Sequence, residues 1–337
     1  KWETTRQFNI GLAGSLISRR LTFEFDYYDK YTNDLLLPAP VPNISGFTSI
    51  VSNVGAMSNK GVELSLHSIN IQNKLFSWNT SFTISHNKNK VEKLLIPITD
   101  GSYGMYQIQQ GHPLYSIYAF HELGVDPKTG NVIDEDVSGP NGKPDGKITA
   151  DDKKIVGDIW PKFEGAFKNT LTYKGFFLDV NVVYRSGNKV FNYTRYFLEA
   201  GGTRGVTRSI QKSSLNYWKK PGDVGVLPRP TSLINADGSA NYNSSNGFSS
   251  RFLENASYIR VRDITLGYDL PRNLAYKLKF TNIHLYATAS NLFTITKYTG
   301  PDPEANNSGD SGSIVQGLDF NTTPQPKTIV VGINLTL

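Results

Sequence analysis

The stretch Thr328 to Leu337 (TIVVGINLTL) decides the fold. Every second residue in it is apolar, and the intervening residues are mostly small or polar. The apolar positions are Ile329, Val331, Ile333, Leu335 and Leu337. At about 3.3 Å per residue the segment extends roughly 30 Å, and less when tilted, which is the strand length that the hydrocarbon layer of a bilayer requires. Strands of soluble sandwiches are shorter, at about 5 to 6 residues, so the pattern predicts a membrane-spanning β-strand.

The composition narrows the class of membrane protein. Of the 337 residues 38% are hydrophobic, and the mean hydropathy of −0.35 excludes a bundle of membrane-spanning helices. A transmembrane β-barrel fits so polar a chain, because every second residue of its strands faces water. The absence of cysteine excludes disulfide scaffolds and cysteine-based zinc sites. The formal charge is +6, but lysine and arginine are scattered rather than gathered in a stripe, which argues against a nucleic-acid partner.

Together with this stretch, alternating patterns along the chain predict about nine antiparallel strands. The expected strands are 7–17, 20–30, 61–68, 75–87, 163–173, 176–186, 257–270, 283–290 and 328–337. In 257–270 the apolar parity switches between Val261 and Ile264, which predicts a β-bulge near Asp263.

The connections between these strands alternate between short and long. Residues 31–60, which contain Pro38, Pro40 and Pro42, are predicted to form a loop, as are the long stretches that follow the fourth, sixth and eighth strands. The connection 271–281 is expected to be a turn of moderate length with a helical turn in it. Such sorting by length is typical of an outer-membrane barrel, with short periplasmic turns and long extracellular loops.

An odd number of strands sets a further expectation. About nine strands place the two chain ends on opposite sides of the membrane, whereas single-chain bacterial barrels have an even strand number. The missing strands are therefore expected from residues that precede Lys1 or from another chain.

Several short motifs follow one another along the chain: Asn53–Leu66 (NVGAMSNKGVELSL), Gly124–Gly130 (GVDPKTG), Asp145–Ile148 (DGKI), Pro161–Phe163 (PKF), Tyr173–Phe176 (YKGF), Ala256–Pro271 (ASYIRVRDITLGYDLP), Asn291-Leu292, Tyr298–Gly300 (YTG) and Asp302–Glu304 (DPE). They resemble motifs of the SusC/RagA family of TonB-dependent outer-membrane transporters. Each motif alone is weak, but together they span nearly the whole chain in the order of the family.

The resemblance implies an all-β fold in which residues 1–337 form the C-terminal portion of a barrel of about 22 strands, without its plug domain and N-terminal strands. It implies a bacterial outer-membrane importer of oligosaccharides or peptides, surrounded by lipid and powered by TonB through the missing N-terminal region. It also implies a surface lipoprotein partner of the SusD type. The chain departs from the usual aromatic last residue, because it ends in Leu337. The alternatives are a siderophore-type TonB-dependent receptor and a surface adhesin or binding module without transport.

Candidate binding residues lie in the long loops and on the polar faces of the strands. Aromatic rings match the apolar faces of sugars or bind peptides, and polar neighbours fix the orientation. The loop candidates for substrate contact are Tyr103, Tyr106, Tyr115, Tyr118, Tyr193, Arg195, Tyr196 and Trp218. The alternative for them is that they pack the loops or meet the lipoprotein. The candidates for the barrel lumen are Glu24, Asp26, Asp179, Asn181 and Arg185.

The Asp-rich segment 134–152 is a candidate calcium loop. A twelve-residue calcium loop that begins at Asn141 has Asp145 at position five, a glycine at position six and Asp152 at position twelve. Lys143 at position three places a cation where a ligand belongs, which favours an Asp/Gly turn instead. The sequence contains neither an HExxH zinc motif nor a GxSxG nucleophile elbow, so we do not expect an enzyme, and calcium is the one cofactor considered.

Overall fold

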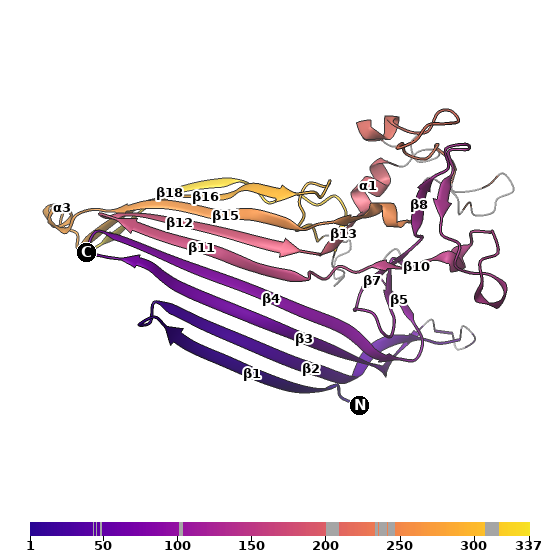
Figure 1. The fold of residues 1–337 in the computed structure, drawn as a ribbon, viewed down its shortest axis with the longest axis horizontal. Helices are drawn as coiled ribbons and strands as arrows, with labels where there is room; N and C mark the ends of the chain where they lie inside the picture. Colours follow the sequence, from indigo (N-terminus) through magenta and orange to yellow (C-terminus); the bar gives the residue numbers. More distant parts are fainter. Residues whose placement is uncertain are drawn as a thin grey trace.

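The computed structural model describes residues 1–42, 44, 46–47, 49–100, 104–199, 209–232, 235, 241, 247–306 and 317–337. Its main feature is an antiparallel sheet of nine strands, which lie side by side in the order in which they occur along the chain (Figure 1). The strands are β1 (Thr4–Leu16), β2 (Leu21–Pro40), β3 (Ser49–Gln72), β4 (Phe76–Leu94), β11 (Phe163–Tyr173), β12 (Phe176–Ser186), β15 (Tyr258–Asp269), β16 (Asn282–Thr296) and β18 (Thr328–Thr336). The expected all-β antiparallel fold and its nine long strands are confirmed.

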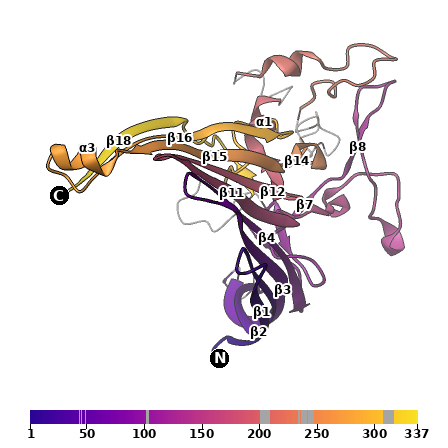
Figure 2. The ribbon, with the colours of Figure 1, turned by 60° about the vertical axis from the view of Figure 1, so that its left-hand side comes forward.

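Short and long connections lie at opposite ends of this sheet. The short turns and helix α3 (Arg272–Lys277) gather at one end, and the small sheets and helix α1 (Tyr193–Leu198) at the other, which we call the loop end (Figure 1). Turned by 60°, the sheet is seen to curl, so that β1 and β2 run at a steep angle to β16 and β18 (Figure 2). In the part of the chain that the structure describes, no helix is long and apolar enough to cross a membrane.

The prediction that residues 31–60 form a loop is wrong for most of that range. β2 continues to Pro40 and pairs with β3 as far as Pro40 opposite Ser49. Pro38 and Pro40 lie beyond the residues of β2 that pair with β1, which reach Asn33 opposite Thr4. The bulge predicted near Asp263 is confirmed by a register shift between Val261 and Asp263.

The long connections also contain strands that the sequence patterns did not predict. One small sheet is formed by β5 (Ile98–Asp100), β6 (Tyr106–Ile108), β7 (Ser116–Ala119) and β10 (Lys154–Gly157). A second is formed by β13 (Lys189–Asn192), β14 (Leu253–Asn255) and β17 (Leu318–Asp319), and a hairpin by β8 (Glu122–Val125) and β9 (Val132–Asp134). Strands of two to four residues are too short to show a period, which is why the pattern missed them.

The register divides the side chains of the large sheet into two faces, because directly paired residues project to the same side. One row of paired residues across the sheet is Gly11, Asp26, Glu63, Ser85, Glu164, Arg185, Tyr258 and Thr296. The adjacent row is Leu12, Phe25, Leu64, Ile84, Gly165, Tyr184, Ile259 and Ile295. The sheet therefore has a polar face and an apolar face, and large apolar side chains such as Leu12 and Val331 are 62% and 78% exposed on the latter. Soluble monomers rarely expose so continuous an apolar surface, whereas lipid covers it without cost.

Two adjacent valines test this division of faces. Val331 lies opposite Ala287 on the apolar face, and Val330 lies opposite Thr288 on the polar face. We expect Val331→Arg to destabilise the intact protein by about 2–4 kcal/mol and Val330→Arg to have little effect, because only the first places a charge in lipid. Denaturant titration of both variants folded in lipid vesicles measures the difference. Equal losses in the two variants would contradict the assignment of the faces.

Candidate functional site

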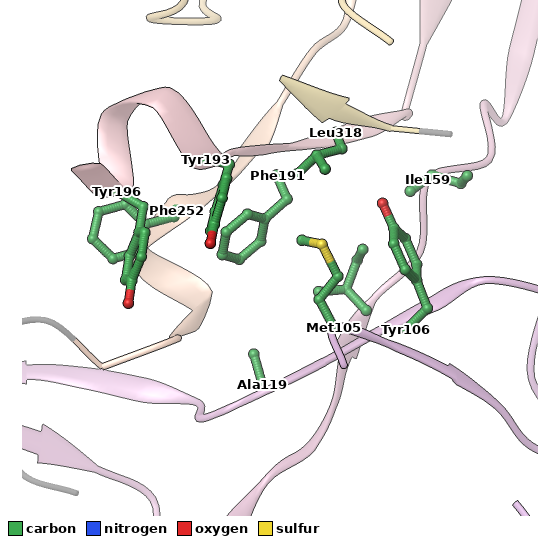
Figure 3. Close-up of a cluster of buried hydrophobic side chains, with 10 residues drawn as sticks. Met105, Tyr106, Ala119, Ile159, Phe191, Tyr193, Tyr196, Phe252 and Leu318 are labelled. Atoms are coloured by element: carbon green, nitrogen blue, oxygen red, sulfur yellow. The ribbon is translucent and has the colours of Figure 1, made fainter. Parts of the chain in front are cut away.

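Buried aromatic and aliphatic side chains hold the loop end together. The cluster comprises Met105, Tyr106, Ile117, Ala119, Ile159, Phe191, Tyr193, Tyr196, Phe252 and Leu318 (Figure 3). Asn192 caps the start of α1, because its side-chain oxygen accepts a hydrogen bond from the Arg195 amide, and the helix places Tyr193 and Tyr196 side by side with ring centroids 5.2 Å apart. Burial of these rings gives the loops a core of their own.

Three of the predicted substrate-contact residues belong to this core. Tyr106, Tyr193 and Tyr196 are 0%, 4% and 5% exposed, and Tyr115 packs edge-on against Tyr106 at 5.9 Å between ring centroids. Burial raises the pKa of the Tyr106 hydroxyl well above its usual value, and the nearby Tyr115 adds to the shift. The rings lie where the alternative expectation put them, packed within the loops, and substrate contact by them stays a prediction.

The other substrate-contact candidates are dispersed. Arg195 forms ion pairs with Glu199 at 2.7 Å and with Glu254 at 3.0 Å. Trp218 donates a hydrogen bond from Nε1 to the Pro127 carbonyl, and a Cβ at Gly130 would clash with its ring. Tyr118 is half-buried in β7. Tyr103 lies outside the described residues. Substrate contact by these residues also stays a prediction.

A network of charges joins the start of β15 to the segment that follows β16. Arg260, with a side chain 3% exposed, contacts Asp302 and Glu304 at 2.5 Å each, and Arg262 contacts Glu304 at 2.8 Å. The Tyr258 hydroxyl also bonds Glu304. These five residues, here called the Arg260 clasp, belong to two of the sequence motifs, YIRVRD and DPE, which thus bind each other.

The buried carboxylate of the clasp also accepts hydrogen bonds from the backbone. Burial raises the pKa of the Asp302 carboxyl, but hydrogen bonds from the Gln325 and Glu304 amides and from Arg260 outweigh it and hold that pKa below its usual value. A buried ion pair repays its desolvation only when its remaining lone pairs are also bonded in this way. The arrangement therefore fixes the loop against the polar face. Tyr258 and Tyr298 are buried among these loop contacts, at 5% and 6% exposed.

We expect Arg260→Met to release the segment 297–306 from the sheet, because Asp302 would remain buried beside no cation. Breaking such a pair costs about 3–5 kcal/mol. Hydrogen exchange of the amides of 297–306 in the intact protein measures this local stability. The matched control is Arg262→Met, whose side chain is 31% exposed, with an expected loss below about 1 kcal/mol. Equal protection in the two variants would show that the clasp does not hold the loop.

The five predicted lumen residues share the polar face of the sheet. Asp26 pairs with Glu63 and Glu24 with Ser65 in the register, and Asn181 pairs with Lys168. Asp179 accepts a hydrogen bond from Thr170 at 2.5 Å and lies 3.7 Å from Lys168, and Arg185 contacts Glu164 at 2.8 Å. The structure thus brings Glu24, Asp26, Asp179, Asn181 and Arg185 onto one surface. That this surface faces the lumen stays a prediction.

A polar cavity of about 600 Å³ lies between this face and the loops. It is lined from the sheet by Tyr28, Glu63, Ser85, Asn87, Glu164 and Arg185, and from the loops by Ile159, Trp160, Pro161, Asn188, Lys189, Val190, Pro303, Glu304, Ala305, Asn306 and Gly317. Its volume is within the range of about 300–1,000 Å³ usual for small-molecule sites.

The NKGVEL motif shapes this cavity. The Tyr28 ring lies across Gly61, where any Cβ would clash with it. Asn59 accepts a hydrogen bond from Asn89, whose own oxygen accepts one from the Leu114 amide, so the motif also ties the sheet to the loops. Glu63 was in a motif singled out from the sequence but was not predicted as a site residue. No local sequence pattern indicates that Lys189 or Asn188 lines the cavity, because only the tertiary fold brings them to it.

The carboxylates among the candidate calcium ligands accept hydrogen bonds from backbone amides of their own loop. Asp152 is fully buried and accepts hydrogen bonds from the amides of Val137, Ser138 and Thr149. Burial raises the pKa of Asp152, but these amides outweigh it and lower that pKa well below its usual value. Asp145 accepts a hydrogen bond from the Lys147 amide, and Asn141 adopts φ 61° within a short 3-10 turn. Within the described ranges no three His, Asp or Glu side chains gather as a metal site, and calcium binding here stays a prediction.

The β8–β9 hairpin contains a carboxyl that titrates near neutral pH. Asp134 lies opposite Glu122 in the register and is 8% exposed, and its Oδ1 has no hydrogen-bond partner among the described residues. Burial, together with the negative charge of Glu122, raises the pKa of Asp134 from 3.8 to about 7, against the smaller opposing effects of Arg251 and His121.

The stability of this hairpin should fall as the pH rises through about 7. Because the folded-state pKa lies above the unfolded one, the stabilisation from protonated Asp134 is complete below about pH 4 and is lost above the folded value. Hydrogen exchange of the β8 and β9 amides, corrected for intrinsic rates and measured at about pH 5 and pH 8, follows the change. Asp134→Asn should abolish the pH dependence, and the exposed control Asp151→Asn should retain it. A hairpin equally protected at both pH values in the unsubstituted protein would refute the prediction.

Taken together, an antiparallel sheet with one apolar and one polar face, capped by folded loops at one end, defines the wall of an outer-membrane β-barrel. Residues 1–292 match the family model described as TonB dependent receptor-like, beta-barrel, and the chain belongs to this family. The resemblance to SusC/RagA proteins and the outer-membrane location are thereby confirmed.

Three relatives show how far the likeness extends. The TonB-dependent receptor P3 of Formosa agariphila is 32% identical over 364 residues, which cover 99% of this chain and 34% of the relative. The TonB-dependent receptor SusC of Bacteroides thetaiotaomicron is 28% identical over 99% of this chain and 32% of its own length. The solved structure of the RagAB peptide importer in the open-open state matches with a TM-score of 0.82 and 31% identity, covering 100% of this chain and 35% of that chain. The chain thus spans about one third of the length of these relatives.

Proposed function

We propose that this chain forms part of the barrel wall and the outer loops of a TonB-powered importer of oligosaccharides or peptides, working beneath a SusD-like surface lipoprotein. The observation that carries the proposal is the polar cavity enclosed between the polar face of the sheet and the loops. An importer needs such a water-lined space beside its wall, whereas an adhesin has no need for a polar inner face.

The relatives support an importer of oligosaccharides or peptides over a siderophore receptor. Two of them are named as a TonB-dependent receptor SusC and a RagAB peptide importer. The folded loops support a role in contact with substrate or lipoprotein, because loops that have their own buried core and an ion-paired clasp can present a defined surface.

The proposal is tested by deletion in the native bacterium. Removing the gene for the intact protein, or the gene for TonB, should abolish uptake of a labelled oligosaccharide or peptide mixture that the parent imports. Uptake of glucose, which is small enough for porins, serves as the control. Uptake that persists in both deletions refutes the importer, and loss of ferric-siderophore uptake on deletion of this protein's gene alone would favour the siderophore alternative.

A further inference from the structure

The charges around the cavity are mostly compensated by one another. Arg185 pairs with Glu164 at 2.8 Å, and Glu304 is held by the arginines of the Arg260 clasp. Of the charged side chains that line the cavity, two have no ion-pair partner in the part of the chain that the structure describes, Glu63 and Lys189. One of these charges is negative and the other is positive.

The two unpaired charges come from different walls. Glu63 projects from β3 on the polar face of the sheet and is exposed. Lys189 begins β13 on the loop side and is half-buried, with its Nζ so close to Gly157 that a Cβ there would lie 2.8 Å away. A carboxylate on one wall and an ammonium on the other complement a ligand that carries both charges.

The neutral polar groups of the cavity add acceptors. Asn188 is 4% exposed, and its Oδ1, like that of Asn87, has no hydrogen-bond partner among the described residues. Buried polar atoms in native proteins are nearly always bonded, so two such oxygens beside one cavity call for a ligand or solvent that donates. Peptide N–H groups are donors of this kind.

We propose that the cavity binds short peptides with free termini, with the terminal ammonium at Glu63 and the terminal carboxylate at Lys189, in preference to neutral oligosaccharides. This inference rests on the proposed import function and selects one of its two substrate classes. Neutral sugars carry no charge opposite to either side chain, and the preference therefore comes from charge rather than from shape.

Calorimetry on the intact protein in detergent tests the proposal with four probes: tetraalanine, its N-acetylated form, its C-amidated form and maltotetraose. Tetraalanine should bind most tightly. Glu63→Gln should weaken binding of tetraalanine about tenfold and leave the N-acetylated form unchanged, because a hydrogen bond to a charged group is lost only for the free amine. Lys189→Gln should likewise affect only probes with a free carboxylate.

Glu3→Gln is the matched control, because Glu3 is exposed and does not line the cavity, and this variant should bind all four probes as the unsubstituted protein does. Losses that are equal for free and blocked termini, or no losses at all, overturn the inference. Maltotetraose bound as tightly as tetraalanine, with TonB-dependent uptake intact, also overturns the inference but leaves the importer standing. Absence of TonB-dependent uptake for every substrate refutes the importer itself.

Discussion

Backbone hydrogen bonding is the constraint on which the rest of this structure depends. In hydrocarbon no water is present to satisfy an N–H or C=O group, so a chain that crosses with strands must bond each strand to its neighbours. The nine strands do so in one continuous antiparallel ladder. That ladder fixes the two-residue period, which sorts the side chains into a row such as Asp26, Glu63 and Glu164 and an adjacent row such as Phe25, Leu64 and Ile84.

Outside the ladder a different balance operates. The loops face water and lack neighbouring strands of the large sheet, so they order themselves by burying rings around Phe191 and by neutralising charges in the Arg260 clasp. Burial of the rings provides the driving force for ordering the loops. The clasp selects one loop conformation, since Asp302 pairs with Arg260 in only one arrangement of the loop. The loops thereby enclose a cavity against the sheet, whose strand pairing is the one that a membrane requires.

The long strands and the two faces could be predicted from the sequence because their signal is local and repeats every two residues. Pro38 and Pro40 misled that prediction, because proline within a run of residues argues against a strand, whereas the pairing of this part of β2 with β3 is tertiary information. The burial of Tyr193 and Tyr196 was likewise not readable, since an aromatic residue suits a loop core and a binding surface equally well. The lining of the cavity by Glu63 and Lys189 joins residues from β3 and β13 that no sequence spacing relates.

The charged side chains beside the cavity fall into two groups, those that form ion pairs within the structure and those that do not. Arg260, Arg262 and Glu304 neutralise one another while they hold a loop, and Arg185 and Glu164 do the same across paired strands. Charges that are compensated in this way contribute little field to the cavity beside them. The electrostatic potential in the cavity therefore depends mainly on the charged lining residues that form no ion pair. In the described part of the chain these are Glu63 on the sheet and Lys189 on the loops. Substitutions at these two positions would therefore change the charge of the cavity while the ladder, the loop core and the clasp remain unaltered.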